Sequence, residues 1–231
     1  MRLVVRTLSE LCITVGAIVV LFVAYVLFWT GIEADGASDA QIGRLQRQWT
    51  QTPGPGPGRK PTAPPAPPAY RHGKPFAVMY IPRFGKDWDW PVLEGAEVAT
   101  LKKGLGHYAG TAELGGTGNF AVAGHRRTYG DPFKDFPRLR PGDAVLLTDG
   151  TTWFTYRVHS RPYRTVPSDI GVIDSVPRPM EPDATPFRGP GRYLTLTTCD
   201  PEWGSSHRLV VWARLEATRP AADGRPRAVH S

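Results

Sequence analysis

The chain has 231 residues, enough for one domain of ordinary to large size, but its composition leaves only about the last two thirds looking globular. The formal net charge of +7 and the isoelectric point near 9.6 would suit a nucleic-acid partner. No nucleic-acid-binding motif accompanies them, so we expect no nucleic acid among the partners. The basic excess outside the expected core is either an ordinary solvated surface or a means of attraction to anionic headgroups and polymers.

An uncharged apolar run at residues 11–29 is the first element. It has about 19 residues, roughly 28 Å as a helix, which nearly matches the hydrocarbon core of a bilayer. Arg2 and Arg6 precede the run and acidic residues, beginning with Glu33, follow it. The positive-inside rule then predicts a single-pass protein of the cell membrane, with residues 1–10 in the cytoplasm and the folded domain extracytoplasmic. A cleaved signal peptide is the alternative interpretation.

Residues 30–74 are expected to form an extracytoplasmic flexible linker. Their Pro/Gly-rich part, 52–69, cannot build a helix or a sheet ladder, because proline removes donors and glycine adds backbone entropy. A partly extended tether of this kind could hold a domain on the order of tens of Å from the bilayer. Earlier in the linker, Ile42, Leu45 and Trp49 have weak helical spacing, which predicts a short helix or disorder there.

A folded domain is expected at residues 75–216, where short segments alternate apolar and polar residues between Gly, Pro and Asp. The expected strands are 76–81, 90–93, 118–124, 143–148, 152–159, 192–198 and 207–215, with one short helix at 97–103. Many short strands with no βαβ rhythm predict an all-β fold, a small antiparallel barrel or sandwich. Residues 217–231 are expected to be a basic disordered tail.

Three expected strand ends carry a cysteine, a histidine and an arginine. Cys199 ends one apolar run, His125 follows another, and Arg208 begins a strand nine residues after the cysteine. These residue types suit thiol chemistry, in which a sulfur attacks a carbonyl, an imidazole carries a proton and a fixed cation stabilises the oxygen. Because Cys12 lies in the membrane run, Cys199 is a lone thiol in an exported domain, which marks it as reactive.

Each of these residues also has an ordinary interpretation. A free cysteine is commonly a small buried hydrophobe, so Cys199 could belong to the core. His125 could be a satisfied structural histidine, and Arg208 an exposed cation at a strand end. His107 and His207 compete with His125 for the role of proton carrier.

The motifs around these residues resemble the sortase family, whose signature is a TLxTC strand followed by an arginine. The chain has Thr-Leu-Thr-Thr-Cys-Asp-Pro, Gly-Asn-Phe-Ala-Val-Ala-Gly-His-Arg and His-Arg-Leu-Val-Val-Trp-Ala, and the resemblance covers residues 75–216. Within the family it looks most like the class E enzymes of actinobacteria, which are high-GC Gram-positive bacteria. The segment Gly-His-Tyr-Ala-Gly-Thr-Ala at 106–112 is similar to their HYPGTA element, with Ala109 in place of the usual proline.

The resemblance implies a sortase-type eight-stranded closed β-barrel with one or two short helices. It implies a cysteine transpeptidase that cleaves an LAxTG- or LPxTG-like C-terminal sorting signal of a secreted protein between Thr and Gly. Cys199 would hold the product as a thioester and pass it to an amine of a peptidoglycan precursor, lipid II or a stem peptide. His125 would protonate the departing amine, and Arg208 would reach the substrate carbonyl.

Tyr108, Thr197 and Thr198 are expected to bind the signal. A signal with Ala in place of Pro has a backbone N–H that the tyrosine hydroxyl can accept. The long Pro-rich segment 160–191 is expected to form part of the signal groove, as the corresponding loop does in sortases. No cofactor and no metal are expected, since no acidic cluster resembles a calcium loop.

Two rival functions remain open at this point. An L,D-transpeptidase type of enzyme also joins His, Cys and Arg on a β-rich fold, but its cysteine normally follows Ser-x-Gly, whereas Cys199 follows Thr-Thr. A non-catalytic, membrane-tethered β-domain that binds wall polymer through its basic surface is the other. Trapping of a thioester with a sorting peptide separates both from a sortase.

Overall fold

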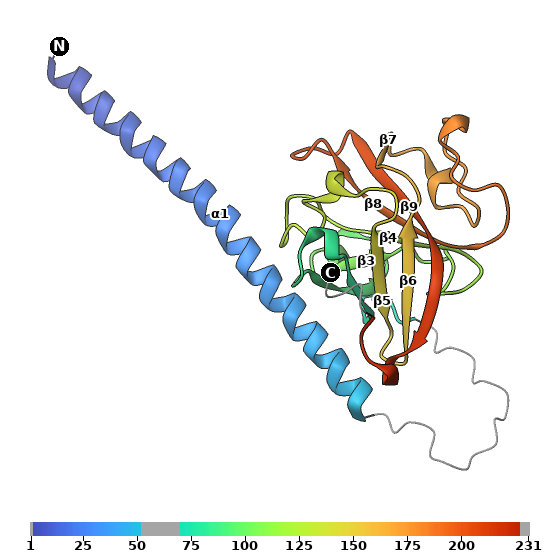
Figure 1. Cartoon of the computed structure of the whole chain (residues 1–231). Coiled ribbons are helices and arrows are strands. Elements are labelled where there is room, and N and C mark those ends of the chain that lie inside the picture. The colour runs from blue at the N-terminus through green and yellow to red at the C-terminus, as the bar shows by residue number, and fades with distance from the viewer. Residues whose placement is uncertain (1, 52–69, 227–231) are drawn as a thin grey trace.

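The computed structural model describes residues 2–51 and 70–226, a long N-terminal helix beside a β-barrel (Figure 1). The strands are β1 (Pro75–Tyr80), β2 (Asp89–Glu94), β3 (Leu105–His107), β4 (Gly118–Ala123), β5 (Ala144–Thr148), β6 (Thr152–Val158), β7 (Tyr163–Thr165), β8 (Arg192–Asp200) and β9 (His207–Pro220). The α-helices are α1 (Arg2–Gln51) and α2 (Val98–Leu101), and short 3₁₀ turns are η1 (Pro82–Phe84), η2 (Phe136–Arg138), η3 (Ile170–Ile173), η4 (Pro182–Ala184) and η5 (Ala221–Asp223).

Eight of these strands close into a barrel in the order β6-β5-β1-β2-β3-β4-β8-β9, and pairing of β9 with β6 completes the ring. The short β7 pairs with β9 outside this ring. The expected eight-stranded closed barrel is therefore confirmed. The simpler expectation of a purely antiparallel sheet is wrong for two pairs, because β2 with β3 and β4 with β8 run parallel. The second parallel pair joins distant parts of the chain, which periodicity along the chain cannot reveal.

The C-terminal end of β9 differs from the sequence-based expectation. Residues 217–220 continue the strand and pair with β6, from Thr155 opposite Ala217 to Thr152 opposite Pro220. The predicted disordered tail at 217–231 is therefore wrong for its described part, and residues 227–231 lie outside the described residues. The reason is physical: β6 would otherwise present an unpaired edge, and the extension of β9 closes it.

Helix α1 also differs from expectation, because it continues to Gln51 and occupies the first half of the predicted flexible linker. Ile42 and Leu45 are 6% and 3% exposed. They pack against an apolar patch on the outside of the barrel, together with Trp49. The barrel residues of this patch are Val78, Tyr80, Leu146 and Trp153, with Ala144 and Ala221 beside them.

The linker prediction is thus wrong for residues 30–51, while residues 52–69 lie outside the described residues. Ile42, Leu45 and Trp49 are spaced so that they lie on one face of the helix. Packing of this face against the barrel stabilises the helix. Gly150, in the β5–β6 turn, has φ of +87°, and a Cβ there would collide with the indole of Trp49. The turn at Gly150 and the side chain of Trp49, which are far apart in the sequence, therefore fit each other.

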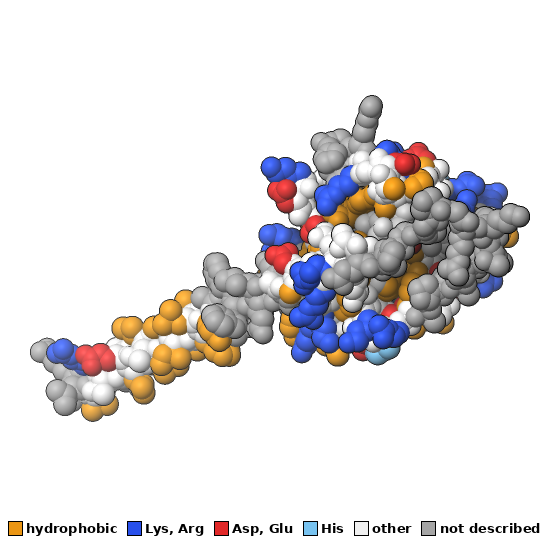
Figure 2. All heavy atoms as spheres, turned by 90° about the horizontal axis from the view of Figure 1, so that it is seen from below, with side chains coloured by type: hydrophobic (Ala, Val, Ile, Leu, Met, Phe, Trp, Pro, Cys, Tyr) orange, Lys and Arg blue, Asp and Glu red, His pale blue; other side chains and the backbone are white. Residues whose placement is uncertain are grey.

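The N-terminal part of α1 is long and apolar enough to cross a membrane. By length and composition the described span is Val4–Val23, with mean hydropathy 2.0 and none of it buried against the barrel. Figure 2 shows apolar side chains covering this part of the helix. The span overlaps the predicted run 11–29 but begins earlier, and it includes the exposed pair Arg6–Glu10. The helix fits a membrane anchor.

The barrel wall formed by β4, β8 and β9 is covered on both faces. Leu194 and Leu196 of β8 point into the barrel core. The alternate residue Tyr193 faces outward and packs with Val172 and Phe187, from the segment between β7 and β8. Strand residues alternate between faces, so the position of each side chain on this wall follows from its register.

Candidate active site

Three strand ends meet at one end of this wall. In the antiparallel pair of β8 and β9, Cys199 lies directly opposite Arg208. In the parallel pair of β4 and β8, Ala123 lies opposite Thr197, and the N–H of Gly124 donates to the carbonyl of Thr197 at 3.1 Å. Continuing that register carries His125 to the level of Cys199.

Cys199 and Arg208 also share a face of this wall. Residues directly opposite each other in an antiparallel pair project from the same side of the sheet. Val210 and Trp212 of β9 face outward, so Arg208 in the same alternation does too, and Cys199 with it. Cys199 is half-buried and has no disulfide partner. The thiol and the guanidinium therefore lie side by side on the outer face of the barrel.

His125 sits in a surrounding that favours its neutral form. Burial, and next the positive charge of Lys102, lower the pKa of His125. Its ring packs at 5.0 Å from the ring of Tyr129, and the ammonium of Lys102 lies over that tyrosine ring at 5.2 Å. Nε2 of His125 is buried and has no hydrogen-bond partner among the described residues. A buried polar atom left free in this way is available to a reacting group.

Arg208 is held by its own loop. Its Nη1 donates to the carbonyls of Ser205 and His207, both at 2.9 Å. A guanidinium has five N–H donors, so others remain for an oxygen on the outer face. The pairing of β8 and β9 sets the start of the Arg208 strand beside the end of the Cys199 strand.

Of the three expected substrate-binding residues, Tyr108 and Thr197 contact each other, whereas Thr198 contacts the backbone of Gly124. The hydroxyl of Tyr108 lies 3.0 Å from Oγ1 of Thr197, which joins the β3–β4 connection to the strand of Cys199. Thr198 alternates to the other face, is 3% exposed, and its Oγ1 donates to the carbonyl of Gly124 at 2.8 Å. Thr198 thus braces the backbone just before His125.

His107 and His207, the two other candidates for the proton carrier, make different contacts from those of His125. His107 is 2% exposed, its Nδ1 lies 2.6 Å from a carboxylate oxygen of Glu94, and its Nε2 lies 2.9 Å from Oγ1 of Thr111. It holds the turn that carries Tyr108. His207 is half-buried next to Arg208, with Nδ1 at 3.0 Å from Oγ of Ser206.

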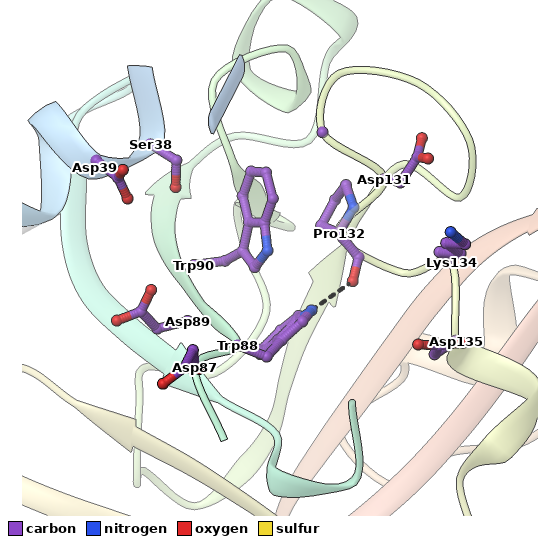
Figure 3. Close-up of a pocket in the computed structure, with 11 residues that line it drawn as sticks. Ser38, Asp39, Asp87, Trp88, Asp89, Trp90, Asp131, Pro132, Lys134 and Asp135 are labelled. Carbon is purple, nitrogen blue, oxygen red and sulfur yellow. Dashed lines mark hydrogen bonds between the residues drawn. The ribbon is translucent and has the colours of Figure 1, made fainter. Parts of the chain in front are cut away.

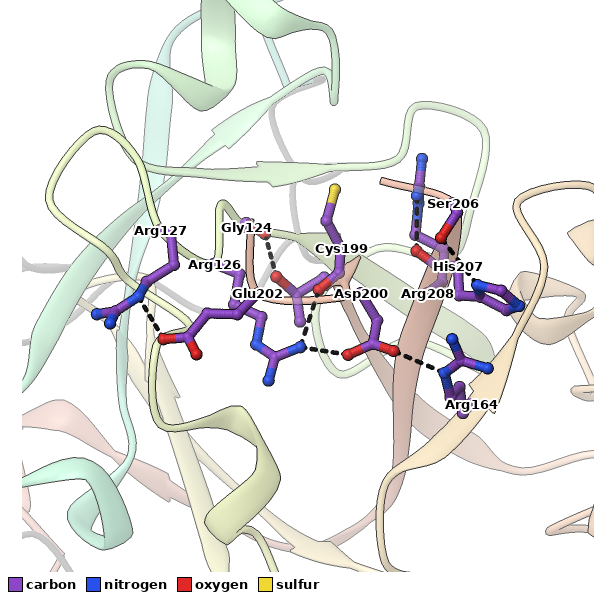
Figure 4. A network of polar contacts seen from close by, with 11 residues as sticks. Gly124, Arg126, Arg127, Arg164, Cys199, Asp200, Glu202, Ser206, His207 and Arg208 are labelled. Carbon is purple, nitrogen blue, oxygen red and sulfur yellow. Dashed lines mark hydrogen bonds and ion pairs between the residues drawn. The ribbon is translucent and has the colours of Figure 1, made fainter. Parts of the chain in front are cut away.

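A charged network beneath the site escaped the sequence analysis. Asp200 accepts a hydrogen bond from Arg126 at 2.5 Å and another from Arg164 at 2.6 Å (Figure 4). Burial alone would raise the pKa of Asp200, but the hydrogen bonds and charges of Arg164 and Arg126 outweigh it and lower the pKa. Arg126 follows His125 directly and Asp200 follows Cys199 directly. These two opposite charges, each directly after a residue of the candidate site, are the sequence feature that could have revealed the network.

The segment between β7 and β8 covers the outer face beside the site. Carbonyl oxygen of Val172 accepts hydrogen bonds from Nε1 of Trp212 at 3.0 Å and from Oγ1 of Thr195 at 3.3 Å. The same segment exposes large apolar side chains: Val166, Ile170 and Met180 are 38%, 74% and 67% exposed. The expectation that residues 160–191 form part of the signal groove stays a prediction.

A closed eight-stranded barrel with a cysteine, a histidine and an arginine at the ends of three adjoining strands brings together the residue types that thiol acyl transfer requires. Residues 79–216 match the model of the sortase domain family, and the chain belongs to the sortase family of cysteine transpeptidases.

Its relatives point to class E of that family. The structure of sortase E from Streptomyces avermitilis is 64% identical with a TM-score of 0.64, covering 69% of this chain and 99% of that one. The structure of sortase E1 from Streptomyces coelicolor is 37% identical with a TM-score of 0.63, over 70% of this chain and 99% of that one. Sortase SrtE1 of Streptomyces coelicolor is 36% identical over 98% of this chain, which spans only 61% of that relative's length.

Proposed function

We propose that this protein is a membrane-anchored cysteine transpeptidase that cleaves an LAxTG- or LPxTG-like C-terminal sorting signal between Thr and Gly. It then transfers the secreted protein to an amine of a peptidoglycan precursor, lipid II or a stem peptide. The observation that carries the proposal is the register that sets Cys199 directly opposite Arg208 on the outer face, with His125 at the end of the neighbouring strand.

The reaction has two halves in this proposal. The thiolate of Cys199 attacks the carbonyl carbon of the signal's threonine, and the guanidinium of Arg208 stabilises the negative charge on the carbonyl oxygen. His125 as imidazolium gives its proton to the glycine nitrogen, the C–N bond breaks, and a thioester remains on Cys199. An incoming amine then attacks the thioester, its proton passes to His125, and the cysteine sulfur leaves.

The low pKa of His125 agrees with a small active fraction. Thiolate and imidazolium must be present together, although the neutral imidazole is favoured, so the reactive pair of protonation states is a minor one. In this proposal, burial of His125 and the charge of Lys102 determine how large that fraction is.

Recognition of the signal is assigned to Tyr108 and Thr197, whose hydroxyls share a hydrogen bond on the outer face. Thr198, braced against Gly124, supports the site from inside the wall and is a positioning residue. A tripeptide lies in the active site of the solved sortase E1 from Streptomyces coelicolor, which supports a peptide substrate for this chain as well. The apolar span Val4–Val23 supports membrane anchoring, with the N-terminus cytoplasmic and the barrel outside.

The test is to incubate the full chain in detergent with LAxTG and LPxTG peptides and to follow it by mass spectrometry. We expect an acyl adduct on Cys199, release of the fragment that begins with glycine, and an amide product when an amine is added. Cys199→Ala should give neither adduct nor cleavage, whereas Cys12→Ala should behave as wild type. A protein that forms no adduct with either peptide, or one whose Cys199→Ala variant still cleaves, would contradict the proposal.

A further inference from the structure

A cleft of about 480 Å³ lies between α1, the start of β2 and the loop that leaves His125 (Figure 3). That volume is within the range of small-ligand sites. One wall is formed by Ser38 and Asp39 of α1, the floor by Asp87, Trp88, Asp89 and Trp90, and the other wall by Gly130, Asp131, Pro132, Lys134 and Asp135. The cleft is separate from the outer face of β8 and β9 that carries Cys199.

The lining of this cleft is acidic, whereas the protein as a whole is basic. Five carboxylates and one ammonium line it, although the whole chain carries a formal charge of +7. Asp131 lies 3.6 Å from Arg127, and Asp135 lies 3.2 Å from Arg138, so these two are partly neutralised.

Asp39 and Asp89 have no ion-pair partner within 4.0 Å in the part of the chain that the structure describes, and they line the same wall and floor. Burial, and next the nearby charges of Asp39 and Asp87, raise the pKa of Asp89, against an opposing effect of Arg225. Carboxylates that repel one another around a cleft favour a cation between them.

Ser38 is an independent sign of a ligand. Its side chain is 3% exposed, and its hydroxyl oxygen has no hydrogen-bond partner among the described residues. In Figure 3 the hydroxyl points from α1 into the cleft, between Asp39 and Trp90. A buried hydroxyl without a partner is costly, and an N–H donor in the cleft would satisfy it. Indole faces together with carboxylates are also the surroundings that an organic ammonium prefers.

The cleft is tied to the catalytic loop. The N–H of Phe133 donates to the carbonyl of His125 at 3.0 Å, so the wall at 130–135 is fixed to the backbone of the proton carrier. Trp88 donates from Nε1 to the carbonyl of Pro132 at 3.0 Å, which joins the floor to the same wall. A cation held here is therefore concentrated next to the loop that begins at His125.

We propose that this acidic cleft captures the protonated primary amine of the acceptor and raises its concentration next to the loop that begins at His125; the amine then leaves the cleft and loses a proton to solvent, and the neutral amine attacks the thioester on Cys199. The inference rests on the proposed transpeptidase function and adds a site for the second substrate. The carboxylates of Asp39 and Asp89 attract the ammonium, and Oγ of Ser38 accepts one of its N–H groups. Because Ser38 and Asp39 belong to α1, a barrel without its helix lacks half of the site.

The experiment compares two nucleophiles on the full chain in detergent, with the thioester formed from an LAxTG peptide. Glycinamide is an ammonium at neutral pH, whereas hydroxylamine is uncharged and serves as the matched probe. In the double variant Asp39→Asn and Asp89→Asn, kcat/KM for glycinamide should fall about three- to tenfold. The kcat/KM for hydroxylamine and the rate of thioester formation should stay at wild-type values.

Two further measurements separate capture from a change in fold. Ser38→Ala should lower kcat/KM for glycinamide alone, and Glu216→Gln, at an exposed acidic residue of β9 outside the cleft, should change neither nucleophile. Added salt should weaken glycinamide transfer more in wild type than in the double variant. Equal losses with both nucleophiles, or an unchanged glycinamide value, would overturn the inference. Failure of the proposed function itself would be visible earlier, as absence of the thioester before any nucleophile is added.

Discussion

At the scale of single residues, the surroundings of His125 decide how much of the active pair of protonation states exists. Burial lowers the pKa of the imidazole and the ammonium of Lys102 lowers it further. Tyr129 lies between the two, with His125 on one side and Lys102 over its ring. A lysine outside the sequence motifs thus contributes to the lowered pKa of His125, the proposed proton carrier.

Removal of that charge should raise the pKa of His125. In Lys102→Gln the burial contribution stays and the charge repulsion goes, so the pKa should move up toward its ordinary value, with more imidazolium at neutral pH. Titration of the His125 ring by NMR measures the shift. Lys103→Gln is the matched control, because Lys103 is an exposed neighbour that does not contribute to the pKa of His125. Equal shifts in both variants would show that the effect is not specific to Lys102.

Tyr108 should set the preference between signals. One hydrogen bond to the backbone N–H of an Ala-containing signal is worth about 0.5 to 1.5 kcal/mol, so LAxTG should be preferred over LPxTG by roughly several-fold to tenfold. Tyr108→Phe should narrow the ratio of kcat/KM for the two peptides. Because the hydroxyls of Tyr108 and Thr197 lie 3.0 Å apart, Thr197→Val should be non-additive with it in a double-mutant cycle. A wild-type preference for LPxTG, or strictly additive effects, would remove this role.

At the scale of elements, the docking of α1 on the barrel is the main departure from what the sequence predicts. The contact uses the helix face of Ile42, Leu45 and Trp49 and the outer surface of β1, β5 and β6. Most helical stability in proteins comes from packing of an apolar face, and here that packing is with a barrel far along the chain.

Leu45→Asp should release the helix from the barrel without unfolding the barrel. A carboxylate placed in this apolar contact costs several kcal/mol unless it moves to water, and undocking provides that escape. Trypsin should then cut faster after Arg44 and Arg47, while the barrel's melting temperature changes little. Gln46→Asp, on the exposed side of the same turn, should be cut at the wild-type rate. Protection that persists in Leu45→Asp would mean that the helix does not depend on this contact.

The sequence predicted the long alternating strands and the strand ends that carry Cys199, His125 and Arg208, but not what depends on partners distant in the chain. Cys199 opposite Arg208 could be anticipated, because their strands are consecutive and antiparallel. The parallel pairing of β4 with β8, the three-residue strands β3 and β7, and the extension of β9 along β6 could not. A strand of three residues has too few apolar–polar alternations for its period to be recognised in the sequence. The unpaired edge of β6 that the end of β9 covers exists only in the folded barrel. The contacts of Lys102 and Asp200 were hidden for the same reason.

At the scale of the whole molecule, residues 1–10 and the barrel should lie on opposite sides of a bilayer that the apolar part of α1 spans. Arg2 and Arg6 stand before the apolar run, and acidic residues from Glu33 onward stand after it, so the proposed topology has the C-terminus outside. A reporter fused after Ser231 should be active only outside the cytoplasm, and the mature protein should retain its N-terminal residues. N-terminal sequencing that begins after Trp29 would instead identify a cleaved signal peptide.

The docked helix also acts as a ruler. Ile42 lies 13 residues beyond Trp29, the end of the apolar run in the sequence, and at 1.5 Å per residue an unbroken helix of that length measures about 20 Å. A flexible tether would let the barrel sample many heights, whereas a docked helix sets one. If a substrate protein is held in the same membrane by a segment after its cleavage motif, the chain between the two must reach this height. The length of that spacer, and not only the letters of the motif, would then decide which secreted proteins are processed.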